Sequence, residues 1–162
     1  MKNLLLCLNI CRGITNPGNW YFSEDVWKVH NHIQGIAEHY NYKFIINDKH
    51  SGDDPEFRFL PPHLDNEFDR MPLSPRYEGF QVLNKKTLNA LNNEHNKKLI
   101  VDQFDTIDIV GFNITTDIIP TALGLLDYHQ DFAIVADGCG DIKKDMKEAG
   151  LKYMQTIGIK II

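Results

Sequence analysis

Short apolar runs separated by polar stretches occur along the whole chain, and this pattern predicts strands that alternate with helices. The almost continuously apolar run at residues 3–10 favours a central parallel strand that is buried on both faces. Similar runs predict further strands at residues 44–46, 80–83, 107–111, 132–136 and 157–162. We therefore expect an α/β fold with a doubly wound, mostly parallel sheet of about six strands and helices on both faces. We also expect residues 1–162 to form a single domain.

Apolar residues at helical spacing predict helices between these strands. A helix opening at Ser23 would place Val26, Val29 and Ile33 on one face, and another is expected over residues 141–149. Helical character is weaker near residues 88–91 and 98–101. The segment from residue 48 to residue 81 contains several prolines and shows no regular pattern. A long irregular segment of this kind is typical of a functional loop or an interaction surface.

The stretch from residue 106 to residue 122 combines a strand with the start of a helix. Its β-branched run ends at Gly111, where the backbone must bend, and Thr115, Thr116 and Asp117 are possible helix caps. Pro120 favours a cap at Asp117, because the missing N–H then falls in the first turn and no backbone bond is lost. The pattern predicts a carboxylate at a helix start beyond a strand end, where open α/β sheets place ligand sites.

Composition and charge narrow the possible partners. The chain has a net charge of -5 and no basic cluster, which argues against nucleic acid and anionic membranes as main partners. Its three cysteines form no Cys-x-x-Cys pair, so reduced thiols in a cytoplasmic protein are expected. The apolar run at residues 4–8 is too short for a signal peptide, and no run approaches the length that spans a membrane.

Residues 111–122 also resemble a known signature. They read Gly-Phe-Asn-Ile-Thr-Thr-Asp-Ile-Ile-Pro-Thr-Ala, and the isochorismatase-like cysteine hydrolases, which include nicotinamidases, usually have Gly-Val-Ala-Thr-Asp-x-Cys-Val-x-x-Thr-Ala. The nucleophilic cysteine of that family falls on Asp117. The aspartate that ends the family's first strand falls on Asn9, and its lysine corresponds best to Lys85.

The resemblance implies an aspartate, lysine and cysteine triad, of which only Lys85 remains. Asn9 has no titratable site near neutral pH, and the carboxylate of Asp117 is a poor nucleophile towards amides. We expect these three residues to share one pocket. Two interpretations of Asp117 stay open: a displaced acid or base facing the pocket, or a carboxylate that only caps its helix.

The resemblance further suggests a metal site. Asp48-Lys49-His50 matches the Asp-x-His of relatives and Pro61-Pro62-His63 matches a later Pro-x-His, which in nicotinamidases carry metal ligands. Asp48, His50 and His63 are chemically adequate for zinc or a similar divalent ion. The alternative is that these side chains only brace the loop.

A small-molecule ligand is the expected partner, and relatives suggest a homo-oligomer. Its contacts are expected from Asn113, Ile114, Thr115, Thr116, Trp20 and Phe22. The aromatic residues could equally pack in the core. Cys7 is expected in the core, and Cys11 could be a displaced nucleophile, although no base is placed for it.

Three hypotheses follow. The first is a pseudoenzyme that binds a small heterocyclic or carboxylated metabolite near Lys85, Asp117 and Asn9, with little or no amidase activity. The second is an active hydrolase that cleaves an amide or vinyl ether by using Asp117 or a metal-bound water. The third is a protein whose pocket is closed and whose loop at residues 48–81 binds another protein.

Overall fold

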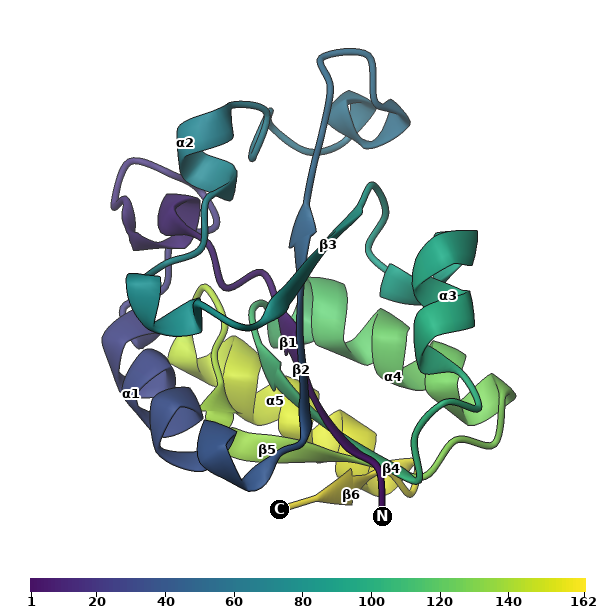
Figure 1. Cartoon of the computed structure of the whole chain (residues 1–162). Coiled ribbons are helices and arrows are strands. Elements are labelled where there is room, and N and C mark those ends of the chain that lie inside the picture. Colours follow the sequence, from purple (N-terminus) through teal and green to yellow (C-terminus); the bar gives the residue numbers. More distant parts are fainter.

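The computed structural model describes residues 1–54 and 57–162 with their side chains, and residues 55 and 56 by backbone alone. Six strands form one parallel sheet in the order β3-β2-β1-β4-β5-β6 (Figure 1). Their bounds are β1 (Asn3–Leu8), β2 (Tyr42–Asp48), β3 (Gln81–Lys85), β4 (Thr106–Gly111), β5 (Phe132–Cys139) and β6 (Lys160–Ile161). The predicted fold class is confirmed.

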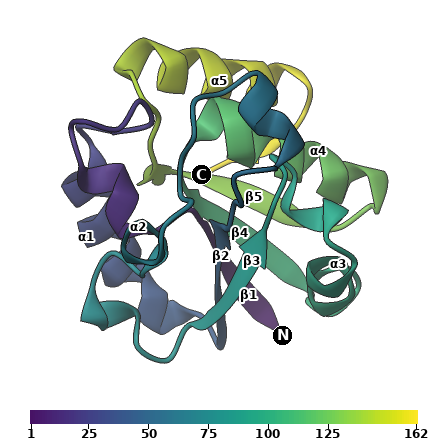
Figure 2. The same ribbon diagram turned by 90° about the horizontal axis from the view of Figure 1, so that it is seen from above.

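Helices cover both faces of the sheet (Figures 1 and 2). They are α1 (Val26–Ile36), α3 (Glu94–Ile100), α4 (Ile119–Asp127) and α5 (Lys144–Thr156), whereas the short α2 (Glu67–Arg70) lies in the connection above the strand ends. One hydrophobic cluster packs α1 against the sheet, and a second packs α3, α4 and α5 against the opposite face. This two-sided cover is what right-handed crossovers produce when the chain moves from β1 first to one side of the sheet and later to the other.

The central strand β1 is buried on both faces of the sheet, and this explains why its sequence is apolar without alternation. Leu4, Leu6 and Leu8 pack on the side of α3, α4 and α5, whereas Leu5 and Cys7 pack on the side of α1. All five side chains are fully buried. Successive residues of a strand point to opposite faces, so a strand covered on both faces needs apolar residues throughout. The predicted central position of this strand is confirmed.

The boundaries of several elements differ from the sequence predictions. Helix α1 begins at Val26 instead of Ser23, and α5 extends from Lys144 to Thr156. Because α5 runs further and the chain then turns at Gly158 with a φ of +91°, β6 keeps only residues 160–161 of the predicted strand. Within the connection from β2 to β3, the single turn α2 is the α-helix, and short 3-10 turns flank it.

The carboxyl ends of the strands are covered by that long connection. Residues 49–80 rise above the ends of β1, β2 and β3, on the side of the sheet away from the N-terminus (Figure 1). A ligand site is therefore expected between the carboxyl ends of these strands and residues 49–80. None of the helices in the described part of the chain has the length and apolar character needed to cross a membrane.

Gly111 permits the bend at the end of β4, and this requirement is testable. Its φ is +116°, and an added Cβ would lie 2.0 Å from the Leu8 carbonyl oxygen. We expect Gly111→Ala to lower the free energy of unfolding by about 3 kcal/mol or more, measured by urea denaturation. Gly35→Ala is the matched control, since no atom lies within 4 Å of its added Cβ; it should change stability by no more than about 1 kcal/mol. Equal losses in the two variants would contradict this account.

Candidate functional site

Four neighbouring segments bring polar side chains to one edge of the sheet. Asn9 follows β1, Asp48 ends β2, and Lys85 ends β3 directly beside Asp48 in the strand register. Asp117 comes from the helical turn that follows β4. All four residues are buried. The strand order thus assembles residues that are up to 108 positions apart in the sequence.

Lys85 binds both carboxylates of this group. Its Nζ donates to Asp117 Oδ1 at 2.5 Å and to Asp48 Oδ1. Asn9 links the same carboxylates, because its Nδ2 donates to Asp48 Oδ2 at 2.8 Å and to Asp117 Oδ1 at 3.0 Å. The side-chain oxygen Oδ1 of Asn9 accepts the backbone N–H of Asp48 at 2.9 Å. We call Asn9, Asp48, Lys85 and Asp117 the buried polar network.

The second oxygen of Asp117 is also occupied. It accepts the hydroxyl of Thr116 at 2.5 Å and the backbone N–H of Asn113 at 3.3 Å. With Lys85 and Asn9 on its first oxygen, the carboxylate accepts four hydrogen bonds. A carboxylate has about four lone-pair sites, so this one has no acceptor capacity left for a substrate proton. Taking up such a proton would require one of the four bonds to break.

The prediction that Asp117 caps its helix is wrong. A wide π-helical turn, Ile114–Ile118, starts directly after Asn113 and leads into α4, in whose first turn Pro120 lies. Asp117 is therefore one turn inside the helical segment, and its side chain reaches back to the Asn113 N–H. Of the two interpretations left open by the sequence, the helix cap is excluded, and a role of Asp117 as a displaced acid or base stays a prediction.

The charges of the network influence one another. Burial raises the pKa of Asp117 above its usual value and nearby Asp48 adds to this, while the Lys85 ammonium opposes it. Burial alone would lower the pKa of Lys85, but the carboxylates of Asp117 and Asp48 outweigh it and raise that pKa. Lys85 therefore stays protonated. One ammonium faces two carboxyl groups, so an excess of negative charge arises in a dehydrated place when both are ionised, and the raised pKa of Asp117 reflects this cost.

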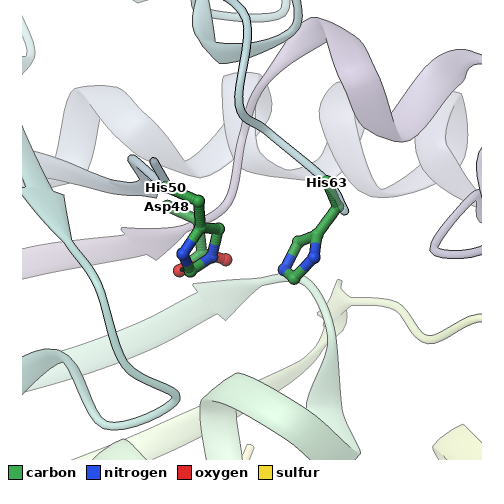
Figure 3. A group of neighbouring side chains, drawn as sticks. All are labelled: Asp48, His50 and His63. Atoms are coloured by element: carbon green, nitrogen blue, oxygen red, sulfur yellow. Dashed lines mark ion pairs between the residues drawn. The ribbon is translucent and has the colours of Figure 1, made fainter. Parts of the chain in front are cut away.

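Asp48 also belongs to a second group, shown in Figure 3 with His50 and His63. Asp48 and His50 lie side by side at the end of β2, and His63 faces them from the connection. Each residue offers one ligand atom, and these atoms all lie within 4.8 Å of one another. His50 Nε2 is 3.7 Å from Asp48 Oδ1.

Both imidazoles are oriented by a bond at Nδ1. His63 Nδ1 lies 3.0 Å from the Pro61 carbonyl, which can only accept, so this nitrogen carries the hydrogen. His50 Nδ1 lies 3.1 Å from Asp54, whose pKa is lowered to about 2 by the Ser51 backbone N–H above all, so Asp54 is an ionised acceptor. In both rings Nε2 is then the acceptor nitrogen. Metal-binding histidines are typically held in this way.

The residues fit a divalent cation in chemistry and only approximately in geometry. Two imidazoles and a carboxylate suit zinc, but tetrahedral zinc would bring its ligand atoms to about 3.3 Å from one another. Both oxygens of Asp48 already accept bonds from Lys85 and Asn9. A bound ion would thus need His63 to approach and Asp48 to share its oxygens.

The sequence did not lead us to expect Asp54 in this group, although its position four residues after His50 is compatible with the contact between the two side chains.

A cavity of about 20 Å³ adjoins both groups. Its walls come from the strand ends, the turn after β4 and the connection: Asn9, Cys11, Ile14, Trp20, Tyr21, Asp48, Leu60, His63, Leu64, Leu88, Asn113, Thr116 and Asp117. This volume holds about one water molecule. Lys85 does not line the cavity, because the carboxylates of Asp48 and Asp117 cover its ammonium.

Of the six predicted ligand contacts, Trp20, Asn113 and Thr116 line this cavity and the other three do not. The reason is the rotation of the helical turn, which directs residues 113, 116 and 117 to one side. Ile114 is fully buried in the hydrophobic cluster of α3, α4 and α5. Thr115 donates its N–H to Asp141 at 2.8 Å, and Phe22 lies outside the wall.

Two atoms in the cavity wall have unmet hydrogen-bonding capacity. Trp20 Nε1 and Asn113 Oδ1 are buried and have no hydrogen-bond partner among the described residues. Asn113 as a whole is only 4% exposed. Buried polar atoms are normally paired, so an unpaired donor and an unpaired acceptor in one wall point to a bound molecule or water.

The cysteines offer no displaced nucleophile. Cys11 lines the cavity, but burial raises the pKa of its thiol to about 12, with Asp48 adding to the effect, so it remains protonated. Cys7 lies in the core as predicted, and burial raises its pKa as well. A thiol that stays protonated at neutral pH is a weak nucleophile.

Comparison with known proteins places the fold. No family model and no curated protein matches the sequence. Solved structures do match: the nicotinamidase/pyrazinamidase of Bacillus subtilis is 20% identical, with a TM-score of 0.85 and 99% of each chain covered. The pyrazinamidase of Pyrococcus horikoshii in complex with zinc is 20% identical, with a TM-score of 0.82 and coverage of 100% of this chain and 99% of that one. A protein from L. infantum in complex with nicotinate is 11% identical, with a TM-score of 0.79 over 99% of this chain and 92% of that one.

The chain has the isochorismatase-like fold. The match runs over nearly the whole length of these chains, which supports the resemblance that the sequence motifs suggested. Within this fold, the chain places Asn9, Lys85 and Asp117 in direct contact.

Removing the ammonium tests how much the network depends on it. We expect Lys85→Met to lower the free energy of unfolding by about 3–5 kcal/mol at pH 7, because two buried carboxylates lose their only counter-charge. The loss should shrink at pH 5. Burial already raises the pKa of Asp117 and the Lys85 ammonium opposes this, so without Lys85 that pKa rises further and the folded variant takes up a proton and gains stability as the pH falls. Urea denaturation at both pH values measures this.

Lys86→Met is the control for that comparison. Its side chain is 65% exposed and its Nζ lies 3.7 Å from Asp54 Oδ1, so we expect a change in the free energy of unfolding within about 0.5 kcal/mol at either pH. A Lys85 variant as stable as this control would show that the network contributes little.

Proposed function

We propose that this protein is a small-molecule-binding member of the isochorismatase-like fold that has lost cysteine-hydrolase chemistry. One observation carries the proposal: a carboxylate, Asp117, stands where the resemblance places the nucleophilic thiol, and four hydrogen bonds saturate it. The primary function is then recognition of a small heterocyclic metabolite.

The surroundings of Asp117 support the loss of amide hydrolysis. The partner that would accept a thiol proton is replaced by Asn9, whose amide donates to both carboxylates instead. The Asn113 N–H, which could otherwise stabilise a negatively charged oxygen, is bonded to Asp117. Nucleophile, base and oxyanion donor are therefore all missing or engaged.

The cavity supports a retained binding role. Trp20 Nε1 and Asn113 Oδ1 offer one donor and one acceptor that a ligand would satisfy. The neighbour from L. infantum is in complex with nicotinate, a small heterocycle. Since a cavity of about 20 Å³ is too small for a ring, ligand entry requires the wall at Leu60, His63 and Leu64 to move outwards.

A second candidate function is metal-assisted hydrolysis, favoured by the orientation of the two imidazoles. Asp48, His50 and His63 would hold the ion, with Asp54 and the Pro61 carbonyl as outer partners. The neighbour from P. horikoshii is in complex with zinc. A bound zinc ion would lower the pKa of a water ligand and so supply a nucleophile that the chain itself lacks.

We further propose a single domain and a cytoplasmic location. All three cysteines are free and buried, which is compatible with a reducing compartment. A homo-oligomer remains the prediction drawn from the resemblance.

Native mass spectrometry of protein purified without chelator tests the proposal and separates the candidates. We expect a population that carries one small organic molecule per chain, or that accepts one from a panel of heterocycles, with no stoichiometric metal. One divalent ion per chain, lost in His63→Asn, would favour the metal-assisted hydrolase. Protein that stays free of organic ligand across the panel would contradict the binding role.

A further inference from the structure

The described side chains that line the cavity include acidic groups and no lysine or arginine. Two of its residues, Asp48 and Asp117, are buried carboxylates. No lysine or arginine occurs among the described side chains that line it, because Lys85 lies behind the carboxylates that it binds. A carboxylated ligand would meet negative charge first, contrary to the expectation that Lys85 receives it.

The aromatic part of the wall favours the same kind of ligand. Trp20 contacts Tyr21 and His63 edge to face, with ring centroids 5.6 and 5.2 Å apart. Tyr21 and His63 are 5.6 Å apart, so the three rings form one corner of the cavity. The rings of Trp20 and Tyr21 attract cations through their electron-rich faces.

Asn113 supplies an observation that is independent of the acidic residues. Its Oδ1 is buried, unpartnered and part of a residue that lines the cavity. An amide oxygen accepts hydrogen bonds, so this atom calls for an N–H or O–H donor. An ammonium group satisfies this acceptor and at the same time compensates the excess negative charge of the network.

From these three features we infer that the cavity takes a small organic cation, an ammonium-bearing or protonated nitrogen compound, in preference to a neutral or carboxylated molecule. This inference rests on the proposed binding function and specifies its ligand class. The cationic nitrogen lies against Asn113 Oδ1 and near Asp48, and the carbon skeleton packs against the rings of Trp20, Tyr21 and His63. The same outward movement of the wall at residues 60–64 admits it.

Three probes of similar size and different charge test the inference: benzylammonium, benzyl alcohol and benzoate. Their binding to chelator-treated protein is measured by isothermal titration calorimetry at pH 7. We expect benzylammonium to bind about tenfold or more tightly than benzyl alcohol, and benzoate to bind more weakly than either. Zinc should weaken benzylammonium binding, since both would use Asp48 and His63.

Asn113→Leu keeps a side chain of similar volume and removes the unpartnered acceptor. We expect it to reduce the affinity for benzylammonium by about tenfold and that for benzyl alcohol by less, because the hydroxyl is an uncharged and therefore weaker donor to the same oxygen. Asn41→Leu, at an exposed position at the opposite end of β2, is the control and should change neither. Circular dichroism confirms that the variants are folded.

The outcomes separate this inference from the function on which it rests. Benzoate or benzyl alcohol binding as tightly as benzylammonium would overturn the cation preference and leave the binding function supported. Failure of all three probes would overturn the inference, while a heterocycle found by native mass spectrometry would still support the binding function. Failure in both experiments would overturn both.

Discussion

The contact of one buried ammonium with two buried carboxylates determines the rest of the site. Lys85 is covered by Asp48 and Asp117, and Asn9 ties the two carboxylates together. Ions are costly to bury unless they are paired and hydrogen-bonded, so the strand ends must hold these groups in place. The same pairing prevents Lys85 from reaching a ligand and fully engages Asp117.

Much of the fold was predictable because it depends on local patterns. The continuous apolar run of β1 and the bend at Gly111 follow from burial on both faces and from a positive φ. The family resemblance placed Asn9, Lys85 and Asp117 in one pocket before their contacts were known, and it assigned Asp48 to a separate metal site. The helix start was misplaced, since nothing in the sequence marks the wide turn that brings Asp117 back to the Asn113 amide.

The chemistry of the site was less predictable, because it depends on which atoms face one another. Residue type could not tell that Ile114 and Thr115 turn away while Thr116 lines the cavity. Nor could it tell that Lys85 lies behind carboxylates and does not line the cavity. The orientation of His50 by Asp54 was equally hidden, since only the fold of the connection shows it. Long-range geometry decides each of these points.

The most direct test of the central claim is the release of ammonia from a small aromatic carboxamide by purified wild-type protein at neutral pH. Asp117 cannot replace a thiolate, and Asn9 cannot act as a base. The account therefore predicts no release above the rate without protein. Release at an ordinary enzyme rate, about 1 s⁻¹ or faster, that disappears in Lys85→Ala would contradict it. Such a result would mean that the buried polar network is a working catalytic centre and not a closed one.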